Sequence, residues 1–391
     1  MSDSNCSYKK YIVIFDTTDV TDAVNCVNIY YDVHSPVISA NILMTDSTDL
    51  LEKMNLTSGE VTVTLEFSCI RNGREFEVRQ EMVLHSIRDK VQLNQKTMMY
   101  TAVCVSSLFK TLNTTRVRQN LIGKANLIIK SLVQQNAVGV TVVAESETDN
   151  SINAGGNNEL LGDVVARLIK MSTQNGKASY IFYQTNYKEC RLETISDLQN
   201  RQSGLSFYYR LTNTSDYRLL NETNRHIVRK YEVIHPTPSE NDKTGYNGTT
   251  SVTYDIMNKR QTNKEVNNQN KVDTTTSNSP QASKQVMVAA TGIQDNSKVL
   301  DNPALFRSSR MSELMRFEQE KVLIQVQGHC DLHLYLGMTS DLELPVQSDT
   351  KTFAIDPKRS GEYIITAVED SFNRQYYITN LELTKLKLEG Q

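Results

Sequence analysis

The densest group of chemically capable side chains is the run His329-Cys330-Asp331-Leu332-His333. If this run is extended, side chains alternate between two faces, so His329, Asp331 and His333 project from the same one. Imidazole and carboxylate groups are zinc ligands, and a metal site is one interpretation. The other is a polar strand end and turn, which we favour because the sequence identifies no group to complete a tetrahedral site. We therefore predict no bound metal.

Other residue types used in catalysis lack partners at a recognisable spacing. Four histidines stand alone or flank a predicted strand: His34, His85, His226 and His235. None of them has a nucleophile and an orienting carboxylate in a known arrangement. Two carboxylate pairs carry no glycosidase signature: Asp46 with Asp49, and Glu313 with Glu318. We interpret all of these as structural or solvated residues.

Gly155-Gly156 precedes a predicted helix, where free backbone N–H groups could hold a phosphate. No Lys follows at the P-loop spacing, so a flexible turn is the favoured interpretation. Dinucleotide-binding, nucleophile-elbow and zinc-protease motifs are also missing from the sequence. We predict no catalytic residue, no cofactor-binding residue and no cofactor, and the chain is not expected to be an enzyme.

The composition excludes several classes of protein. The 391 residues hold 42 Lys and Arg against 45 Asp and Glu, a net charge of −3, whereas a dedicated nucleic-acid binder concentrates positive charge. No apolar run approaches the roughly 18 residues of a membrane span, and the N-terminus lacks a secretory signal. The six cysteines contain no Cys-x-x-Cys pair, and we expect reduced thiols. A chain without stable membrane insertion is predicted.

Residues 1–107 are expected to form a β-domain. Residues 11–15 and 37–44 are short apolar segments, and residues 61–67 alternate apolar and polar side chains with the period of a half-buried strand. Asn72-Gly73 favours a tight turn into a second strand over residues 75–87.

A change to helical periodicity indicates an α/β insertion domain over residues 108–204. Apolar residues recur at helical spacing over 117–135 and again after Asn157 or Asn158, either of which can cap the second helix, which Asn175-Gly176 can end. Residues 179–183 and 189–195 then predict a hairpin.

The rest of the chain returns to β-structure around a polar stretch. We expect residues 205–235 to add strands to a second barrel, and residues 236–307 to be an extended or loop segment with too few apolar side chains to fold alone. Residues 308–391 should complete the second β-domain, with a short helix over 308–319 and strands at 321–327, 362–368 and 375–388.

The order of these elements resembles the hub proteins of contractile injection machines. These are the central baseplate hub of contractile-tailed, T-even-like phages, the late-control protein of temperate phages and the hub half of the type VI secretion spike. The N-terminal similarity runs through Ile38, Ile42, Met44, Asp46, Leu50, Leu51, Leu56 and Gly59-Glu60 into strand 61–67. The helical segments 114–133 and 159–183 are also similar. The C-terminal similarity includes Gly328, Gly337, Ser360, Gly361, Tyr363 and Ile365.

The resemblance implies a mainly β, α+β fold with two tube-type antiparallel β-barrels and an α/β insertion. It implies a homotrimer that forms a pseudo-hexameric ring in the tail baseplate of a virion, assembled in the host cytoplasm. This structural hub would adapt the six-fold tail tube to the three-fold central spike. Its implied partners are the spike or needle protein, tube or tube-initiator proteins, baseplate wedge proteins and the tape-measure protein, with DNA passing during ejection without sequence-specific binding.

Two other functions stay open at this point. A cell-wall-degrading tail enzyme would need a catalytic set, and a receptor-binding tail module would usually show repeats of 20–50 residues. The sequence displays neither feature. In both alternatives the chain would still belong to a phage tail.

Overall fold

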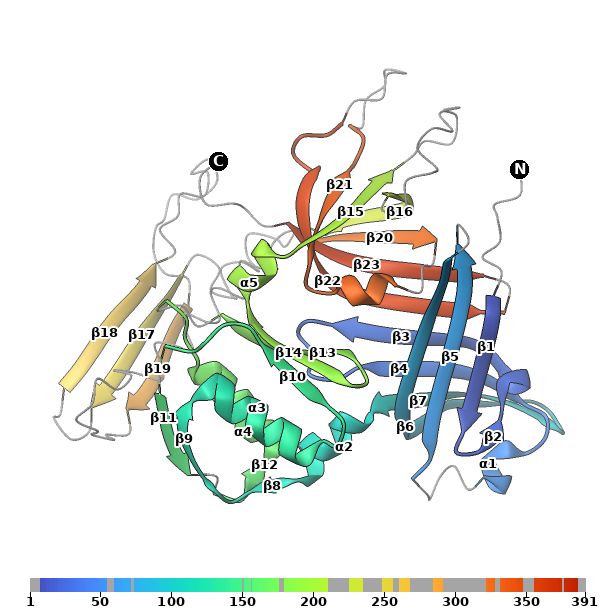
Figure 1. Cartoon of the computed structure of the whole chain (residues 1–391), viewed down its shortest axis with the longest axis horizontal. Coiled ribbons are helices and arrows are strands. Elements are labelled where there is room, and N and C mark those ends of the chain that lie inside the picture. The colour runs from blue at the N-terminus through green and yellow to red at the C-terminus, as the bar shows by residue number, and fades with distance from the viewer. Residues whose placement is uncertain are drawn as a thin grey trace.

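Most of the described residues lie in β-strands, the majority of them paired antiparallel (Figure 1). The computed structural model describes residues 8–54, 60–71, 74–149, 151–155, 157–175, 179–209, 225–234, 248–255, 260–267, 284–290, 321–327, 331–346, 355–374 and 376–385. The expected mainly β, α+β class is confirmed, and strands far apart in the sequence share one 13-stranded sheet.

The N-terminal half of this sheet contains six main strands. They are β1 (Tyr8–Phe15), β3 (Val24–Asp32), β4 (Ser39–Asp46), β5 (Thr62–Arg71), β6 (Arg74–Asn94) and β7 (Thr97–Ser106), in the spatial order β1-β5-β6-β7-β4-β3. Short elements flank them: β2 (Thr18–Asp19), η1 (Thr21–Ala23) and α1 (Leu50–Lys53). The expected hairpin is confirmed by the pairing of Arg71 with Arg74.

The C-terminal half also contains six strands. They are β15 (Gln202–Tyr209), β16 (Arg225–Ile234), β20 (Lys321–Gln327), β21 (Thr339–Glu343), β22 (Gly361–Asn373) and β23 (Tyr377–Lys385). Their spatial order is β15-β21-β22-β23-β20-β16, and β15 pairs with β16, so this half is a closed barrel.

The two halves follow the same plan. If the six strands of each half are numbered from one to six along the chain, their spatial order is 1-4-5-6-3-2 in both halves. One difference is that β1 runs antiparallel to β5, whereas β15 runs parallel to β21. Strand β6 therefore corresponds to β22, and β3 corresponds to β16.

Strand β22 joins the two halves. Its first part pairs with β21, from Gly361 with Leu342 onward, and its second part pairs with β3, from Ala367 with Asp32 to Asn373 with Cys26. Its other edge is covered by β23. The buried apolar residues of both halves consequently form one continuous core, in which Phe67 of β5 stacks on Phe372 of β22 at 4.0 Å.

The insertion between the halves has a separate apolar core. Its elements are α2 (Ser107–Thr114), β8 (Arg116–Val117), β9 (Asn120–Lys124), α3 (Ala125–Asn136), β10 (Thr141–Ala144), β11 (Ser151–Gly155), β12 (Glu159–Leu160), α4 (Leu161–Met171), β13 (Tyr180–Asn186), β14 (Glu189–Thr194) and α5 (Ile195–Asn200). The predicted hairpin is present as β13 and β14.

No helix in the described part of the chain is long and apolar enough to cross a membrane.

Both predicted helices of the insertion start later than the sequence pattern indicated. Residues before Ala125 form strands, because β9 pairs with β11 and Gly123 adopts a φ of 130° that a helix does not allow. The second helix begins after Leu160, since Asn157 and Asn158 have positive φ and lie in the preceding turn. It ends at Met171, before Asn175-Gly176.

Part of the polar stretch 236–307 forms a separate sheet. Strands β17 (Gly248–Asp255), β18 (Arg260–Asn267) and β19 (Lys284–Ala290) pair in the order β18-β17-β19. We expected an extended or loop segment here, and these strands differ from that expectation because their backbone N–H and C=O groups pair with one another. The helix expected at 308–319 lies outside the described residues.

A buried ionic cluster holds the insertion to the closed barrel. The fully buried carboxylate of Glu193 accepts hydrogen bonds from Tyr183 Oη at 2.7 Å, from Arg191 at 3.1 Å and from Arg201. The carbonyl of Arg201 accepts the N–H of Thr339 on β21 at 2.8 Å. Because these charges are paired, their burial costs less than that of an isolated carboxylate.

Gly337 provides a test of this junction. Its φ is +77°, and an added Cβ would lie 2.5 Å from Tyr183 Oη and 3.0 Å from Leu198. We expect Gly337→Ala to lower the free energy of unfolding in urea by about 2–4 kcal/mol, from backbone strain plus steric overlap. Gly139→Ala is the matched control, because its φ is +76° with open space around it. Equal losses in the two variants would contradict this account.

Candidate functional site

The His329–His333 run does not form the extended ligand strand considered above. Residues Leu332–Tyr335 form the 3-10 helix η3, so Asp331 and His333 do not share a strand face. His329 lies outside the described residues. The described residues contain no group of three His, Cys, Asp or Glu side chains arranged to hold a metal ion.

His333 instead forms a buried pair with Asp370 of β22. Its Nδ1 lies 3.7 Å from Asp370 Oδ2, and its ring stacks on Tyr31 of β3 at 4.9 Å. The other carboxylate oxygen accepts hydrogen bonds from Tyr377 Oη at 2.9 Å and Thr379 Oγ1 at 2.7 Å. Both side chains are almost completely buried. This pair lies within the shared core, out of reach of a substrate.

Burial controls the protonation of both groups. Loss of hydration raises the pKa of Asp370 to about 7, although the hydroxyls of Thr379 and Tyr377 favour its ionised form and oppose the rise. Asp331 and Cys69 raise it slightly further. The same loss of hydration lowers the pKa of His333 to about 4. Between these values the folded pair carries one proton, on the carboxyl group.

Asp46, His226 and His85 have structural positions, whereas His235, Glu313 and Glu318 lie outside the described residues. Asp46 accepts the N–H groups of Thr48 at 2.9 Å and Leu50 at 2.7 Å, which is the turn role expected from the sequence. His226 is buried beside Phe207, and His85 contacts Phe109 edge-on.

Gly155, one of the two glycines considered for phosphate binding, does not lie at a helix N-terminus. Gly155 pairs with Asn120 in the β9–β11 ribbon, and strand β12 separates it from helix α4. Gly156 lies outside the described residues. The alternative of a phosphate cradle at this site was wrong, because β12 intervenes before the helix begins.

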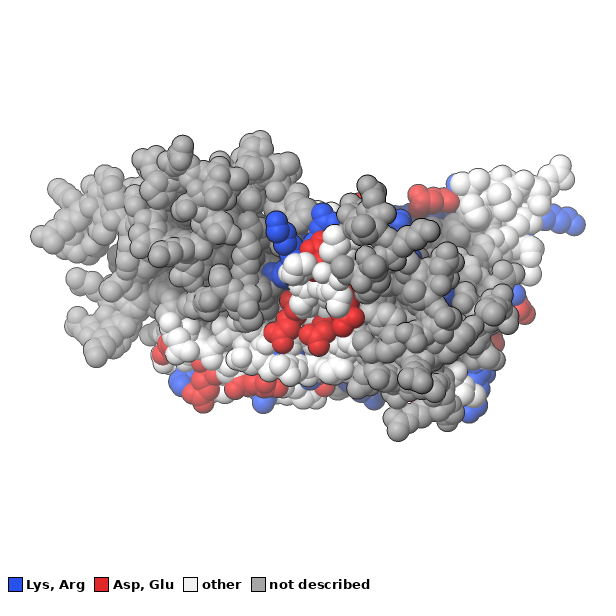
Figure 2. All heavy atoms as spheres, turned by 90° about the horizontal axis from the view of Figure 1, so that it is seen from above, with Lys and Arg blue, Asp and Glu red and all other residues white. Residues whose placement is uncertain are grey.

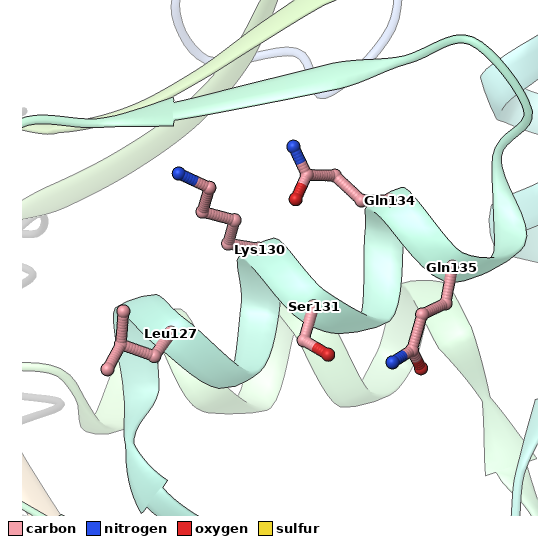
Figure 3. Close-up of a pocket in the computed structure, with 5 residues that line it drawn as sticks. All are labelled: Leu127, Lys130, Ser131, Gln134 and Gln135. Atoms are coloured by element: carbon pink, nitrogen blue, oxygen red, sulfur yellow. The ribbon is translucent and has the colours of Figure 1, made fainter.

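A shallow pocket lies on the outer side of helix α3. It is lined by Leu127, Lys130, Ser131, Gln134 and Gln135 (Figure 3). All five side chains come from one helix, and Figure 3 shows them spread along it rather than directed at a common point. This lining contains no pair of groups suited to acid–base or nucleophilic catalysis.

The most extensive candidate surface is one face of the continuous sheet. Hydrogen-bonded register connects Ser39, Tyr30, Glu369, Asn380 and Gln325 in one row across β4, β3, β22, β23 and β20. A neighbouring row connects Asn41, Asn28 and Ser371. Alternation places these partly exposed side chains opposite the buried apolar ones. We call Asn28, Asn41, Glu369, Ser371, Asn380 and Gln325 the amide face.

Side chains of the amide face bond to one another along the sheet. Gln325 Nε2 donates to Asn380 Oδ1 at 3.0 Å, and Asn380 Nδ2 donates to Glu369 Oε2 at 3.0 Å. Ser371 Oγ donates to Asn28 Oδ1 at 2.8 Å. Cross-strand hydrogen bonds of this kind stabilise a sheet face that has no apolar cover. They also leave few polar groups free to hold a passing molecule.

Charge on and near this face is low and mixed in sign. Glu382 of β23 forms an ion pair with Lys321 of β20 at 2.8 Å, and Glu369 is bonded to Asn380. A surface built to hold DNA would instead carry clustered Lys and Arg. Figure 2, which views the molecule from above, shows a small group of acidic side chains near the middle and scattered basic side chains among the described residues.

Comparison with known proteins identifies the fold. No protein-family model matches the sequence, and no curated protein sequence is significantly similar to it. Among solved structures, a tail protein from Neisseria meningitidis MC58 is 11% identical with a TM-score of 0.56, each chain being covered to 96%. The 43 kDa tail protein of prophage MuSo2 from Shewanella oneidensis is 9% identical with a TM-score of 0.59, with 96% of this chain and 98% of that chain covered.

The chain has the fold of phage tail proteins. A Francisella PdpA-VgrG complex is also similar, at 9% identity and a TM-score of 0.50, with 97% of this chain and 59% of that chain covered. The expected resemblance to baseplate hubs and type VI spike proteins is confirmed at the level of fold. The first two neighbours are described as tail proteins.

Several residues that carried the sequence resemblance have roles in the fold. Ser360 Oγ accepts the N–H of Leu344 at 2.9 Å, and the buried Tyr363 donates its hydroxyl to the Arg359 carbonyl at 2.7 Å. Gly337 fits beside Tyr183. The amide face was missed by the sequence analysis, although polar residues at alternate positions of otherwise apolar strands were its visible signal.

The His333–Asp370 pair predicts a pH dependence that appears only in single variants. In His333→Phe, Asp370 binds its proton more tightly in the folded state than in the unfolded state, because its pKa is raised to about 7. The free energy of unfolding should therefore fall by a few kcal/mol as the pH rises from about 4 to about 7. In Asp370→Asn, His333 binds its proton more weakly in the folded state, because its pKa is lowered to about 4. The free energy of unfolding should therefore rise by a similar amount between about pH 4 and about pH 6.5.

The unsubstituted chain is the control for both variants. Over about pH 4 to 6.5 each state of the pair holds one proton, on His333 when unfolded and on Asp370 when folded, so the two contributions oppose each other. Urea unfolding from pH 4 to 8 measures all three proteins. Parallel pH profiles in both variants would show that the two groups do not titrate as described.

Proposed function

We propose that this chain is the central baseplate hub of a contractile phage tail, acting as a homotrimer. The observation that carries the proposal is the matching strand order of the two six-strand halves. Three copies would place six similar units around one axis. Such a ring is three-fold by subunit and nearly six-fold by unit, which suits an adaptor between a six-fold tube and a three-fold spike.

The fold of tail proteins supports this proposal, as does the resemblance of the strand pattern to known hubs. In this function the partners are the tail tube or tube-initiator proteins above, the central spike protein below and the baseplate wedge proteins around the ring. The chain would act mechanically, sealing the tube until the spike leaves. It would work in the virion tail and need no cofactor.

The amide face is the surface we assign to the channel. It belongs to the strands that connect the two halves, so a ring of six units would bring copies of it around the central axis. Its side chains are mutually hydrogen-bonded and nearly neutral, as a wall should be when the tape-measure protein and DNA pass without binding.

The size of the assembly tests the hub proposal directly. We expect the purified chain, alone or mixed with its tube and spike proteins, to form complexes that contain three copies when measured by mass photometry. Complexes with any other copy number would contradict the hub. Release of peptidoglycan fragments by the chain would instead support a tail enzyme, and binding on a glycan array would support a receptor-binding module.

Charge added to the amide face should slow the passage of DNA. Asn28→Lys with Asn41→Lys places two cations per copy on this face, where they would attract phosphates. We expect virions that carry this variant to assemble normally and eject DNA at least about tenfold more slowly, with recovery at high salt.

The control places the same charge on the outer side of helix α3. Ser131→Lys with Gln134→Lys changes exposed residues of the α3 pocket and should leave ejection unchanged. Equal slowing by the two variants, measured by the release of fluorescently stained DNA, would refute the channel assignment.

A further inference from the structure

The outer half of strand β6 has an unpaired edge. Its first half pairs with β5 as far as Val83, whereas Ser86–Asn94 pairs only with β7 among the described residues. Val91 and Leu93 on this segment are 47% and 54% exposed. This segment is the edge strand of a sheet that continues through β7 into β4, and an open edge of this kind favours pairing with another strand.

The outer half of strand β16 has the same property. It pairs with β15 as far as Val228, and beyond that point Lys230–Ile234 pairs only with β20 in the described part of the chain. Ile234 is 41% exposed. The two open edges belong to different halves of the sheet, one to each.

The chain already contains the junction that would join such edges. Strand β22 corresponds to β6, and its outer half pairs antiparallel with β3, from Ala367 with Asp32 to Asn373 with Cys26. Strand β3 corresponds to β16. Within the chain, the outer half of β22 and the edge of β3 pair with each other. The corresponding edges of β6 and β16 have no partner strand among the described residues.

We propose that Ser86–Asn94 of one copy pairs antiparallel with Lys230–Ile234 of a second copy, repeating the β22–β3 junction between subunits. The contact is heterologous, because each copy gives a different edge to each neighbour, and such contacts generate rings when the rotation closes. This inference rests on the proposed hub function and specifies its subunit contact.

Side-chain charge is compatible with this pairing. The β6 segment carries Arg88, Asp89 and Lys90, and the β16 segment carries Lys230 and Glu232, so both edges present both signs. Opposite charges across an antiparallel pair are favourable, whereas two edges of a single sign would repel. The pairing would also continue the amide-bearing sheet from β16 of one copy into β6 and β7 of the next.

A photo-crosslinking experiment tests the contact without assuming its register. The photoreactive amino acid benzoylphenylalanine is placed at Val91 in the full chain, in the complex with its tube and spike proteins. Irradiation should give covalent oligomers whose digest joins the β6 peptide to the peptide containing 230–234. The same amino acid at Val138, which is 99% exposed on the insertion, is the control and should not give this product.

The outcomes separate this inference from the proposed function. Trimers whose crosslinks from position 91 reach other segments overturn the pairing and leave the hub function standing. Absence of any complex with three copies overturns both.

Discussion

The structure depends on one shared strand. By pairing with β21 through its first part and with β3 through its second, β22 turns two six-strand units into a single sheet with a single core. Backbone hydrogen bonds fix this connection in both distance and angle, which a flexible linker between two barrels would not do. The relative placement of the two units is therefore a property of the sheet itself.

The polar groups near this strand are consistent with that rigidity. Asp370, on the same strand, is satisfied on one oxygen by two hydroxyls of β23 and faces His333 with the other. A buried pair that carries one proton and no net charge avoids the cost of an isolated buried ion. On the opposite face of the sheet, Glu369 is bonded to Asn380. Polar side chains thus occupy both faces of β22.

The insertion is attached by both apolar and ionic contacts. Most of its apolar residues form a separate core, but Ile181, Tyr183, Ile195 and Leu198 belong to the core of the large sheet. The ionic contacts of Glu193 with Arg201 and the close approach of Tyr183 to Gly337 lie beside them. Buried ionic contacts require specific geometry, so they define one docked position rather than a range of them. The insertion and the closed barrel are therefore held in one relative position.

The sequence by itself determined the local elements of this protein. Alternation predicted the strands at 61–67 and 321–327, and the absence of a catalytic spacing favoured a structural role, because such patterns depend only on neighbouring residues. Helix starts near Val117 and Asn157 were misplaced, since pairing of β9 with β11 and positive φ values override helical periodicity. The tertiary structure alone decided that His333 meets Asp370, that the amide face is continuous and that two strand edges have no partner strand among the described residues. Each of these joins residues distant in the chain, and no local pattern specifies which distant strands become neighbours.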